Sequence, residues 1–109
     1  MSYLYAENDC VIVSRGCVLP EAINPEMFWN NILQNRLSIK PISQERWDPK
    51  NNFSPYRELE DKSYSHWGAE ISEEIYNQLR TKLNLEKSSR LETMAQEAFS
   101  QAYDTLTLP

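Results

Sequence analysis

The chain has 109 residues, enough for one small domain with a single core, and its 40% hydrophobic and 11% aromatic residues are typical of a globular chain rather than a disordered one. Its formal net charge of -5 would repel the phosphate backbone of a nucleic acid and an anionic membrane surface, which argues against both as partners. It contains only two glycines, too few for a glycine-rich loop that cradles phosphates.

Residues 1–9 are polar and acidic and are interpreted as a leader that precedes the first element of structure. They contain no apolar run of signal-peptide length, so we expect a soluble, cytoplasmic protein. Cys10 and Cys17 are then expected to be reduced thiols. Together with the single His66, they are too few for a structural zinc site.

The first expected strand is the short run from Cys10 to Val13. Its continuous β-branched residues, bounded by Asp9 and Ser14, predict a strand buried on both faces, as in a parallel sheet. Such a strand needs neighbours, yet the chain offers only weak strand candidates, at Leu37–Ile42 and Ala69–Ile71. The sequence therefore indicates an α/β fold that is incomplete, with one clear strand, about three helices and a long loop.

A first helix is expected from Asn24 to about Gln34. Asn24 is a favourable N-cap, Pro25 suits the first helical position, and Glu26 faces the positive end of the helix dipole. Apolar residues spaced four apart predict a single stripe that faces the core. These residues are Phe28, Trp29, Ile32 and Leu33.

Two further helices are expected after a polar surface loop at 48–62. The second helix begins at Ser72 and ends near Asn84, and the third opens at Ser89, which has capping-box spacing to Glu92. One side of the second helix carries Ile75, Leu79 and Leu83. The apolar residues of the third recur with a helical period and are Leu91, Met94, Ala95, Ala98, Phe99 and Ala102.

Four short blocks of residues follow one another along nearly the whole chain. They read Val-Ile-Val-Ser-Arg-Gly-Cys-Val-Leu-Pro from Val11, Asn-Pro-Glu-Met-Phe-Trp from Asn24, a stretch from Ile39 that ends in Arg-Trp-Asp at 46–48, and Asp-Lys-Ser-Tyr-Ser-His-Trp-Gly from Asp61. This order resembles the amino-terminal segment of the β-ketoacyl synthase (condensing) domain of polyketide synthases and multidomain fatty acid synthases.

The chain departs from the family pattern in three places. The family usually has a glycine two positions before Gly16, where this chain has Ser14, and an arginine after the cysteine, where this chain has Val18. Its methionine-aspartate-proline-glutamine turn before the third helix is not recognisable in Leu85–Ser89. These differences suggest a divergent member or a relaxed copy.

The resemblance implies a thiolase-like fold, of which residues 1–109 would form the amino-terminal part. It also implies the family reaction, in which an acyl chain held on a cysteine is extended with a malonyl group, carried on the phosphopantetheine arm of an acyl carrier protein. In the family, the catalytic cysteine and two histidines lie further along the chain than this sequence extends. No catalytic, cofactor-binding or metal residue is therefore assigned here, and the chain by itself is expected to be inactive.

Cys17 is next to Gly16 and follows the expected strand, which is a common setting for a nucleophile. The resemblance places it in the family's early turn, and a thiol without a nearby base is mostly protonated at neutral pH, so we interpret it as a packing residue. Cys10, inside the expected buried run, is interpreted as inert. His66 has no orienting residue that the sequence identifies and is interpreted as a surface or hydrogen-bonded histidine rather than a general base.

Two other groups combine residue types that are common in active sites. We expect Trp47 to anchor its loop in the core, while Arg46 and Asp48 fix the backbone by charge-assisted hydrogen bonds. Glu73 and Glu74 are adjacent carboxylates, but adjacent helical positions project about 100° apart and cannot flank one substrate bond. Their place at a helix start indicates an interaction with the helix dipole instead.

Two functions stay open at this point. The first is part of a β-ketoacyl synthase, an acyltransferase of polyketide or fatty acid biosynthesis, with the rest of the synthase domain and an acyl carrier protein as partners. The alternative is a small non-catalytic interaction module derived from a synthase, which docks to a synthase or a carrier protein or associates with itself. An unrelated helical binding domain would require the four blocks to match by coincidence.

Overall fold

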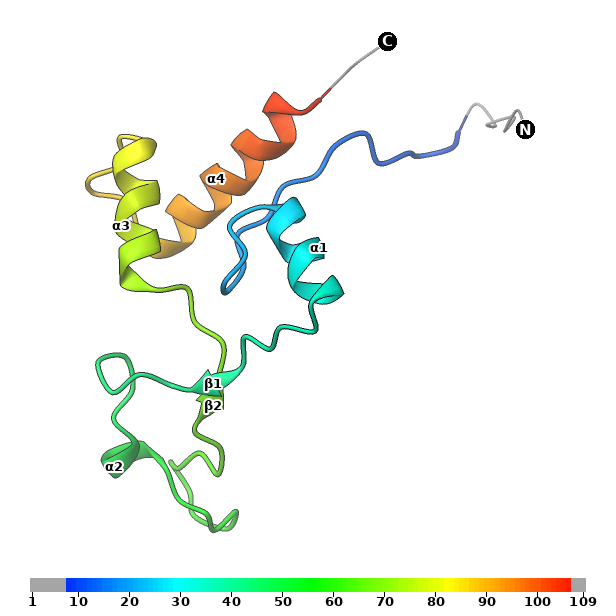
Figure 1. Ribbon diagram of the computed structural model, residues 1–109. Coiled ribbons are helices and arrows are strands. Elements are labelled where there is room, and N and C mark those ends of the chain that lie inside the picture. Colours follow the sequence, from blue (N-terminus) through cyan, green and yellow to red (C-terminus); the bar gives the residue numbers. More distant parts are fainter. Residues whose placement is uncertain (1–7, 107–109) are drawn as a thin grey trace.

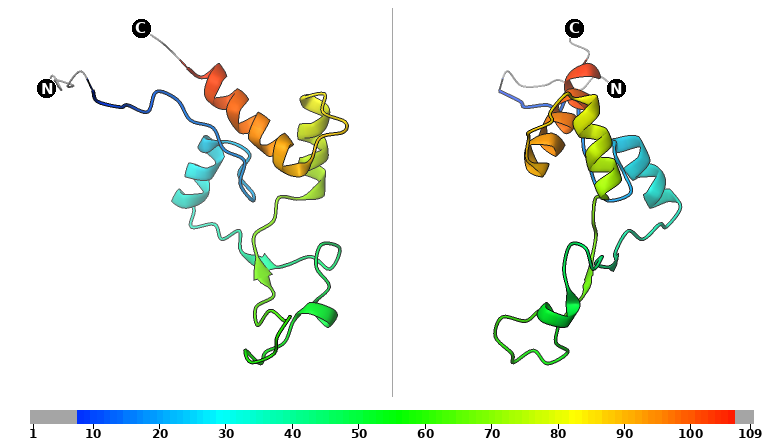
Figure 2. Two further views of the ribbon diagram at one scale, coloured as in Figure 1. Left: turned by 180° about the vertical axis from the view of Figure 1, so that it is seen from behind. Right: turned by 90° about the vertical axis from the view of Figure 1, so that its left-hand side faces the viewer.

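The computed structural model describes residues 8–106. Its elements in chain order are α1 (Pro25–Leu33), β1 (Lys40–Pro41), α2 (Pro49–Asn52), β2 (Trp67–Gly68), α3 (Glu73–Lys82) and α4 (Arg90–Asp104). Three helices, α1, α3 and α4, lie together with the segment that leads into α1, whereas β1, β2 and α2 form an arm that extends away from them (Figures 1 and 2). Helices combined with a small two-stranded sheet agree with the expected α/β class. Within this part of the chain, no helix is long and apolar enough to cross a membrane.

The strand expected at Cys10–Val13 is wrong. The segment is coil, and Ile12 in its middle is 92% exposed. Among residues 8–106, no strand lies beside it to accept and donate backbone hydrogen bonds. A β-branched run forms a strand only when a neighbour pairs with its backbone, and the buried setting that the sequence implied is not supplied by these residues.

The observed sheet lies in the arm instead. β1 and β2 pair antiparallel, with Lys40 opposite Gly68 and Pro41 opposite Trp67. β1 lies within the first of the two weak strand candidates, Leu37–Ile42, and β2 immediately precedes the second, Ala69–Ile71. A side chain at Gly68 would bring its Cβ to 3.0 Å from Cγ1 of Ile42, so the side chain of Ile42, which directly follows β1, favours glycine there.

The segment 48–62, expected as a surface loop, contains the short helix α2 at its start. The Asp48 carboxylate caps that helix by accepting hydrogen bonds from the backbone N–H of Lys50 at 2.9 Å and from the side chain of Asn51 at 2.7 Å. Residues 55–62 are exposed, and the backbone N–H of Ser54 donates to the carbonyl of Ser63 at 2.9 Å, which closes the loop at its base.

The helix starts expected from the sequence are confirmed. The Asn24 side chain accepts from the backbone N–H of Met27 at 2.8 Å, and Ser72 caps α3 in the same way. Ser89 and Glu92 form both hydrogen bonds of a capping box at the start of α4. These ends depend on residues within one turn, which is why the local sequence identifies them.

The faces that the helices bury are only partly those expected. In α3, which packs against α4, Leu79 is buried, as its spacing indicated. The stripe of α1 is exposed, with Trp29 at 59% and Leu33 at 63%, so its expected inward orientation is wrong. In α4, Leu91 and Phe99 are also exposed. Periodicity defines an apolar face, but only a neighbouring element covers it.

The buried residues of α4 are polar. Thr93 is 0% exposed and Glu97 is 4% exposed. The hydroxyl of Thr93 donates to the carbonyl of Ser89 at 3.0 Å and lies 2.9 Å from the hydroxyl of Ser88. Hydrogen bonds of this kind offset the cost of removing a hydroxyl from water. Thr93 is therefore buried with its hydroxyl satisfied by hydrogen bonds.

A set of polar contacts, which we call the α4 clasp, joins α3, α4 and the turn before α1. Lys82 of α3 donates to both carboxylate oxygens of Glu97, at 2.8 and 3.1 Å. Gln101 donates to Glu97 at 3.2 Å and to the carbonyl of Ile23 at 2.6 Å, and its carbonyl oxygen accepts from the backbone N–H of Cys17 at 3.1 Å. Both ends of the Gln101 amide are thus used, and the 17–23 turn is attached to α4 at its two ends.

Gly16 lets the turn approach α4 closely. A Cβ at this position would lie 1.9 Å from the carbonyl oxygen of Ala98, far inside any normal contact distance. Every other residue type would push the chain away from the helix and lengthen the hydrogen bond between Cys17 and Gln101. The glycine and the clasp therefore hold the same piece of backbone in place.

Replacing Gln101 by Leu should release the turn, because Leu has a similar length but neither donor nor acceptor. A part-buried backbone group that loses its partner costs about 1–3 kcal/mol, so the Cys17 amide is expected to exchange with deuterium roughly 5- to 150-fold faster. Hydrogen exchange followed by NMR measures this rate. Gln96→Leu, at an exposed position of the same helix, is the control, and equal Cys17 exchange in the two variants would contradict the clasp.

The arm should loosen at acid pH. The Glu70 carboxylate accepts from the backbone N–H of Ser43 at 2.7 Å and from its hydroxyl at 2.9 Å, and this backbone hydrogen bond is the main cause that lowers the pKa of Glu70 below 4.5. Because the pKa of Glu70 is lowered in the folded chain, its ionised carboxylate stabilises the arm above pH 4.5. This stabilisation is lost as the pH falls through the lowered pKa. NMR of the Ser43 amide between about pH 7 and about pH 3 should follow this loss. A Glu70→Gln variant should remove the transition, and its persistence there would contradict the assignment.

Candidate functional site

The turn at residues 17–23, which we call the Cys17 turn, is the candidate site that the sequence pointed to most directly. The structure places Cys17 beside α4, with its backbone N–H bonded to Gln101. Burial is the larger influence on its thiol and raises the pKa above the ordinary 9.0, while Arg15 acts weakly in the opposite direction. A thiol with a raised pKa is protonated at neutral pH and is a poor nucleophile. The geometry agrees with a packing role for Cys17.

Cys10 has a different environment from the one expected. The sequence suggested a cysteine inside a buried strand, but the side chain is exposed in the extended segment. That correction follows from the missing strand pairing described above. Cys10 is therefore the more accessible of the two thiols.

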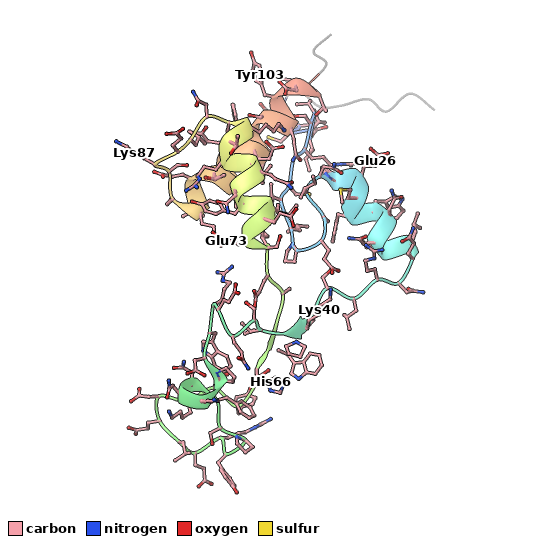
Figure 3. The ribbon with its side chains drawn as sticks, turned by 60° about the vertical axis from the view of Figure 1, so that its left-hand side comes forward. Glu26, Lys40, His66, Glu73, Lys87 and Tyr103 are labelled. Atoms are coloured by element: carbon pink, nitrogen blue, oxygen red, sulfur yellow. The ribbon has the colours of Figure 1, made fainter. Side chains whose placement is uncertain are left out.

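His66 lies in the arm, beside the β1–β2 pair and away from α4 (Figure 3). Its ring packs edge-on against Phe53, with 5.0 Å between the ring centroids, and is 5.7 Å from the ring of Trp67. Its backbone carbonyl accepts from the N–H of Ile42 at 2.8 Å next to the sheet. These aromatic contacts give it a packing role in the arm, and it does not pair with Cys17.

The roles expected for the Arg46–Asp48 stretch are only partly observed. Trp47 is half-buried and Asp48 caps α2. The Arg46 guanidinium makes no hydrogen bond among residues 8–106, so its expected role in fixing the backbone is not seen. Its charge instead helps to lower the pKa of Glu70. The three residues support the arm and do not form a reactive group.

The paired carboxylates at the start of α3 separate as expected for adjacent helical positions. Glu73 forms an ion pair with Arg90 at the start of α4, and Glu74 accepts from the side chain of Gln78 at 3.3 Å on its own helix. Arg90 also donates to the carbonyl of Ile71 at 3.0 Å. These contacts stabilise the α3–α4 pair. No cluster of three or more metal-ligating side chains occurs in the part of the chain that the structure describes.

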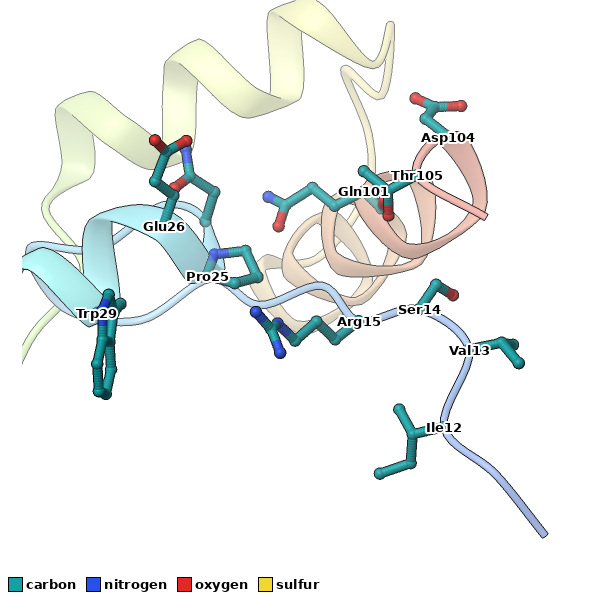
Figure 4. Close-up of a pocket in the computed structure, with 11 residues that line it drawn as sticks. Ile12, Val13, Ser14, Arg15, Pro25, Glu26, Trp29, Gln101, Asp104 and Thr105 are labelled. Atoms are coloured by element: carbon teal, nitrogen blue, oxygen red, sulfur yellow. The ribbon is translucent and has the colours of Figure 1, made fainter. Parts of the chain in front are cut away.

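A groove of about 720 Å³ lies between the extended segment and the adjoining ends of α1 and α4 (Figure 4). Ile12, Val13 and Trp29 give it apolar walls, and Arg15 and Glu26 lie at its border. Its lining includes neither a cysteine nor a histidine, and its two carboxylates, Glu26 and Asp104, come from different helices. The groove offers apolar surface and polar side chains for contact.

The residues that matter most around the Cys17 turn were not recognised from the sequence. Glu97 and Gln101 were part of a helix whose apolar residues were assumed to face inward. A signal was present: Thr93, Glu97 and Gln101 recur every four residues, which places three hydrogen-bonding side chains in one row of the helix. Such a row indicates a polar contact between elements when small residues such as Ala98 lie beside it.

The two cysteines should differ in reactivity with iodoacetamide. Cys10 is exposed, whereas Cys17 is half-buried with a raised pKa, so Cys10 is expected to react at least roughly threefold faster at about pH 8. Peptide mapping by mass spectrometry after timed alkylation measures both rates in one sample. In a denaturant the two rates should converge. Preferential labelling of Cys17 in the native chain would show that its thiol is activated.

The chain matches the family described as the amino-terminal domain of β-ketoacyl synthase over residues 7–106. Three curated relatives are polyketide synthases. PksM of Bacillus subtilis is 31% identical over 68 residues, 62% of this chain and 2% of that protein. ThaG of Burkholderia thailandensis is 29% identical over 66 residues, 61% of this chain and 1% of that protein. The phenolphthiocerol synthesis polyketide synthase Pks15/1 of Mycobacterium marinum is 33% identical over 66 residues, 59% of this chain and 3% of that protein.

The chain thus spans only 1 to 3% of the length of these relatives. No solved structure matches it. The family match nevertheless covers nearly all of the chain and includes the four blocks, the Cys17 turn and the three main helices. The chain therefore belongs to the β-ketoacyl synthase family, as an amino-terminal fragment of its synthase domain.

Proposed function

We propose that the chain is part of a β-ketoacyl synthase that condenses acyl thioesters with malonyl-acyl carrier protein in polyketide or fatty acid biosynthesis. The observation that carries this proposal is the family match over residues 7–106. The polyketide synthases among its relatives favour the polyketide branch. The partners are the rest of the synthase domain and an acyl carrier protein with its phosphopantetheine arm.

In this proposal the chain contributes framework and not reacting groups. Condensation requires a cysteine thiolate that accepts the acyl group from its thioester. It also requires groups that stabilise the enolate formed when the malonyl unit loses carbon dioxide. Cys17 does not suit the first task, because burial raises its pKa, and His66 is held among aromatic rings in the arm. The nucleophile and the two histidines are therefore expected on another part of the synthase.

The chain by itself should not catalyse condensation. Purified chain, incubated with acyl- and malonyl-acyl carrier protein, is expected to give no β-ketoacyl product by mass spectrometry. Activity is expected only after addition of a Bacillus subtilis PksM fragment that begins directly after the segment matching this chain. The corresponding PksM segment serves as the positive control. Product formed by the chain alone would contradict the assignment of the reacting groups to the rest of the synthase.

Cys17→Ser tests the framework role within the same reconstituted enzyme. A packing residue of this size should tolerate the change, so condensation and acyl loading are expected to stay within about twofold of the unmodified chain. Intact-mass spectrometry detects the acyl group on each component. Loss of acyl loading, with binding to the PksM fragment unchanged, would show that Cys17 is the nucleophile.

A further inference from the structure

Glu21 lies at a corner of the Cys17 turn in a backbone conformation that is unusual for its residue type. The chain reverses between Leu19 and Ala22, which exchange backbone hydrogen bonds of 2.8 and 3.0 Å. Pro20 and Glu21 form the corner, and Glu21 has a φ of 58°, in the left-handed region. After a proline, this position of a turn favours glycine or asparagine. Glutamate at this corner therefore carries a conformational cost, which contacts of its side chain can offset.

The carboxylate of Glu21 connects the turn to the start of the arm formed by β1, α2 and β2. Lys40, which lies where the arm meets the helices, forms an ion pair with one carboxylate oxygen (Figure 3). The hydroxyl of Ser38 donates to the other oxygen at 3.1 Å. The hydrogen bond from Lys40 is the main cause that lowers the pKa of Glu21 below 4.5, and the bond from Ser38 is the second. The carboxylate is consequently ionised at neutral pH, where it can hold both donors.

The backbone of Glu21 is held from the side of the helices. The side-chain amide of Asn31 in α1 donates to the Glu21 carbonyl at 2.9 Å. The turn itself is attached to α4, because Gln101 bonds to the backbone of Cys17 and of Ile23. Glu21 therefore joins the arm to a part of the chain that is fixed on two helices.

Few other contacts hold the arm against the helices. Within residues 8–106, α3 contacts α4 and β1 contacts β2, but no helix or strand of the arm contacts α1, α3 or α4. The arm is joined to them by two connecting segments, residues 34–39 and 69–72. At the second of these, Arg90 of α4 donates to the carbonyl of Ile71 at 3.0 Å. With so few contacts, the position of the arm depends strongly on the Glu21 carboxylate.

A cavity of about 520 Å³ lies at the junction of the arm with the helices. Its lining combines Pro20 of the turn and Arg90 of α4 with Ile42 and Trp47 of the arm. Because these residues belong to both sides of the junction, the cavity keeps its shape only while the arm stays in place.

We infer that Glu21 is an electrostatic latch, which holds the arm against the Cys17 turn and lets the arm change its position when the carboxylate is lost or its charge is screened. The inference is independent of the proposed function, because it depends only on contacts within the chain. Glu21 and Lys40 are 32% and 61% exposed, and exposed ion pairs are weak and salt-sensitive. The latch therefore shifts the populations of held and released arm and does not lock one of them.

The distance between a spin label on the arm and one on α4 measures the position of the arm. The labels are attached through Lys50→Cys in α2 and Gln96→Cys in α4, both at exposed positions, after Cys10 and Cys17 are replaced by Ser. Double electron–electron resonance on the full chain gives the distribution of this distance. The unmodified latch is expected to give one dominant distance. Circular dichroism checks that all variants have the same helix content.

Glu21→Gly removes the carboxylate and suits the positive φ, so the turn itself is expected to form. The ratio of molecules at the dominant distance to molecules at other distances should fall roughly two- to fivefold. Glu26→Gln is the matched control, because it removes one negative charge and Glu26 forms no ion pair among residues 8–106. Its distribution should equal that of the unmodified latch. Sodium chloride at about 1 M should shift the unmodified chain in the same direction as Glu21→Gly and leave Glu21→Gly unchanged.

Exchange of the two charges separates the latch from a general effect of substitution. Glu21→Lys and Lys40→Glu should each release the arm, whereas the double variant should restore the dominant distance, because opposite charges again face each other. An unchanged distribution in Glu21→Gly would overturn the inference. So would a broad distribution with the unmodified latch, an equal shift in Glu26→Gln, or a double variant that stays released.

Discussion

The Glu97 carboxylate, 4% exposed, is the group on which the arrangement of the helices depends. A buried carboxylate is costly unless it is paired and hydrogen-bonded, and here Lys82 and Gln101 supply both. Lys82 fixes α3 against α4, and Gln101 extends the network to the backbone of Cys17 and Ile23. Removing either partner would leave a charge or a backbone group without compensation, so the contacts act as one unit.

The polar clasp explains the unusual distribution of apolar residues. A small domain that folds around its own core buries its large apolar side chains, yet Trp29, Phe99 and Ile12 are all exposed. The helices contact one another through the clasp, the Glu73–Arg90 ion pair and the side of α3 that carries Leu79, which leaves much of their apolar surface available. An exposed apolar surface of this extent indicates a contact with another layer of protein.

The same arrangement holds the Cys17 turn in place without using its thiol. The Cys17 turn is held by backbone hydrogen bonds and by close packing of Gly16 on α4, so its position is determined without the thiol. The thiol is left half-buried with a raised pKa, which favours its protonated, weakly nucleophilic form at neutral pH. Membership in the β-ketoacyl synthase family therefore does not make this cysteine the family's nucleophile. The turn instead connects the extended segment to α1 and attaches both to α4.

The sequence by itself determined where the helices begin, because Asn24, Ser72 and Ser89 cap their helices with atoms from the next turn. It also determined the family, because the four blocks are read directly from residue order. It did not determine which faces are covered. The β-branched run at 11–13 predicted a buried strand, but a strand forms only when another backbone pairs with it, and none among residues 8–106 does so.

Tertiary structure alone decided which side of α4 faces the chain. The helical period places Phe99 on one side and Glu97 on the other, and local propensity is the same whichever side is covered. The row that contains Glu97 was chosen because Lys82 and two backbone groups of the 17–23 turn approach there with complementary donors and acceptors. That complementarity joins residues up to 84 positions apart, as in the hydrogen bond from Cys17 to Gln101, a separation that no local pattern reports.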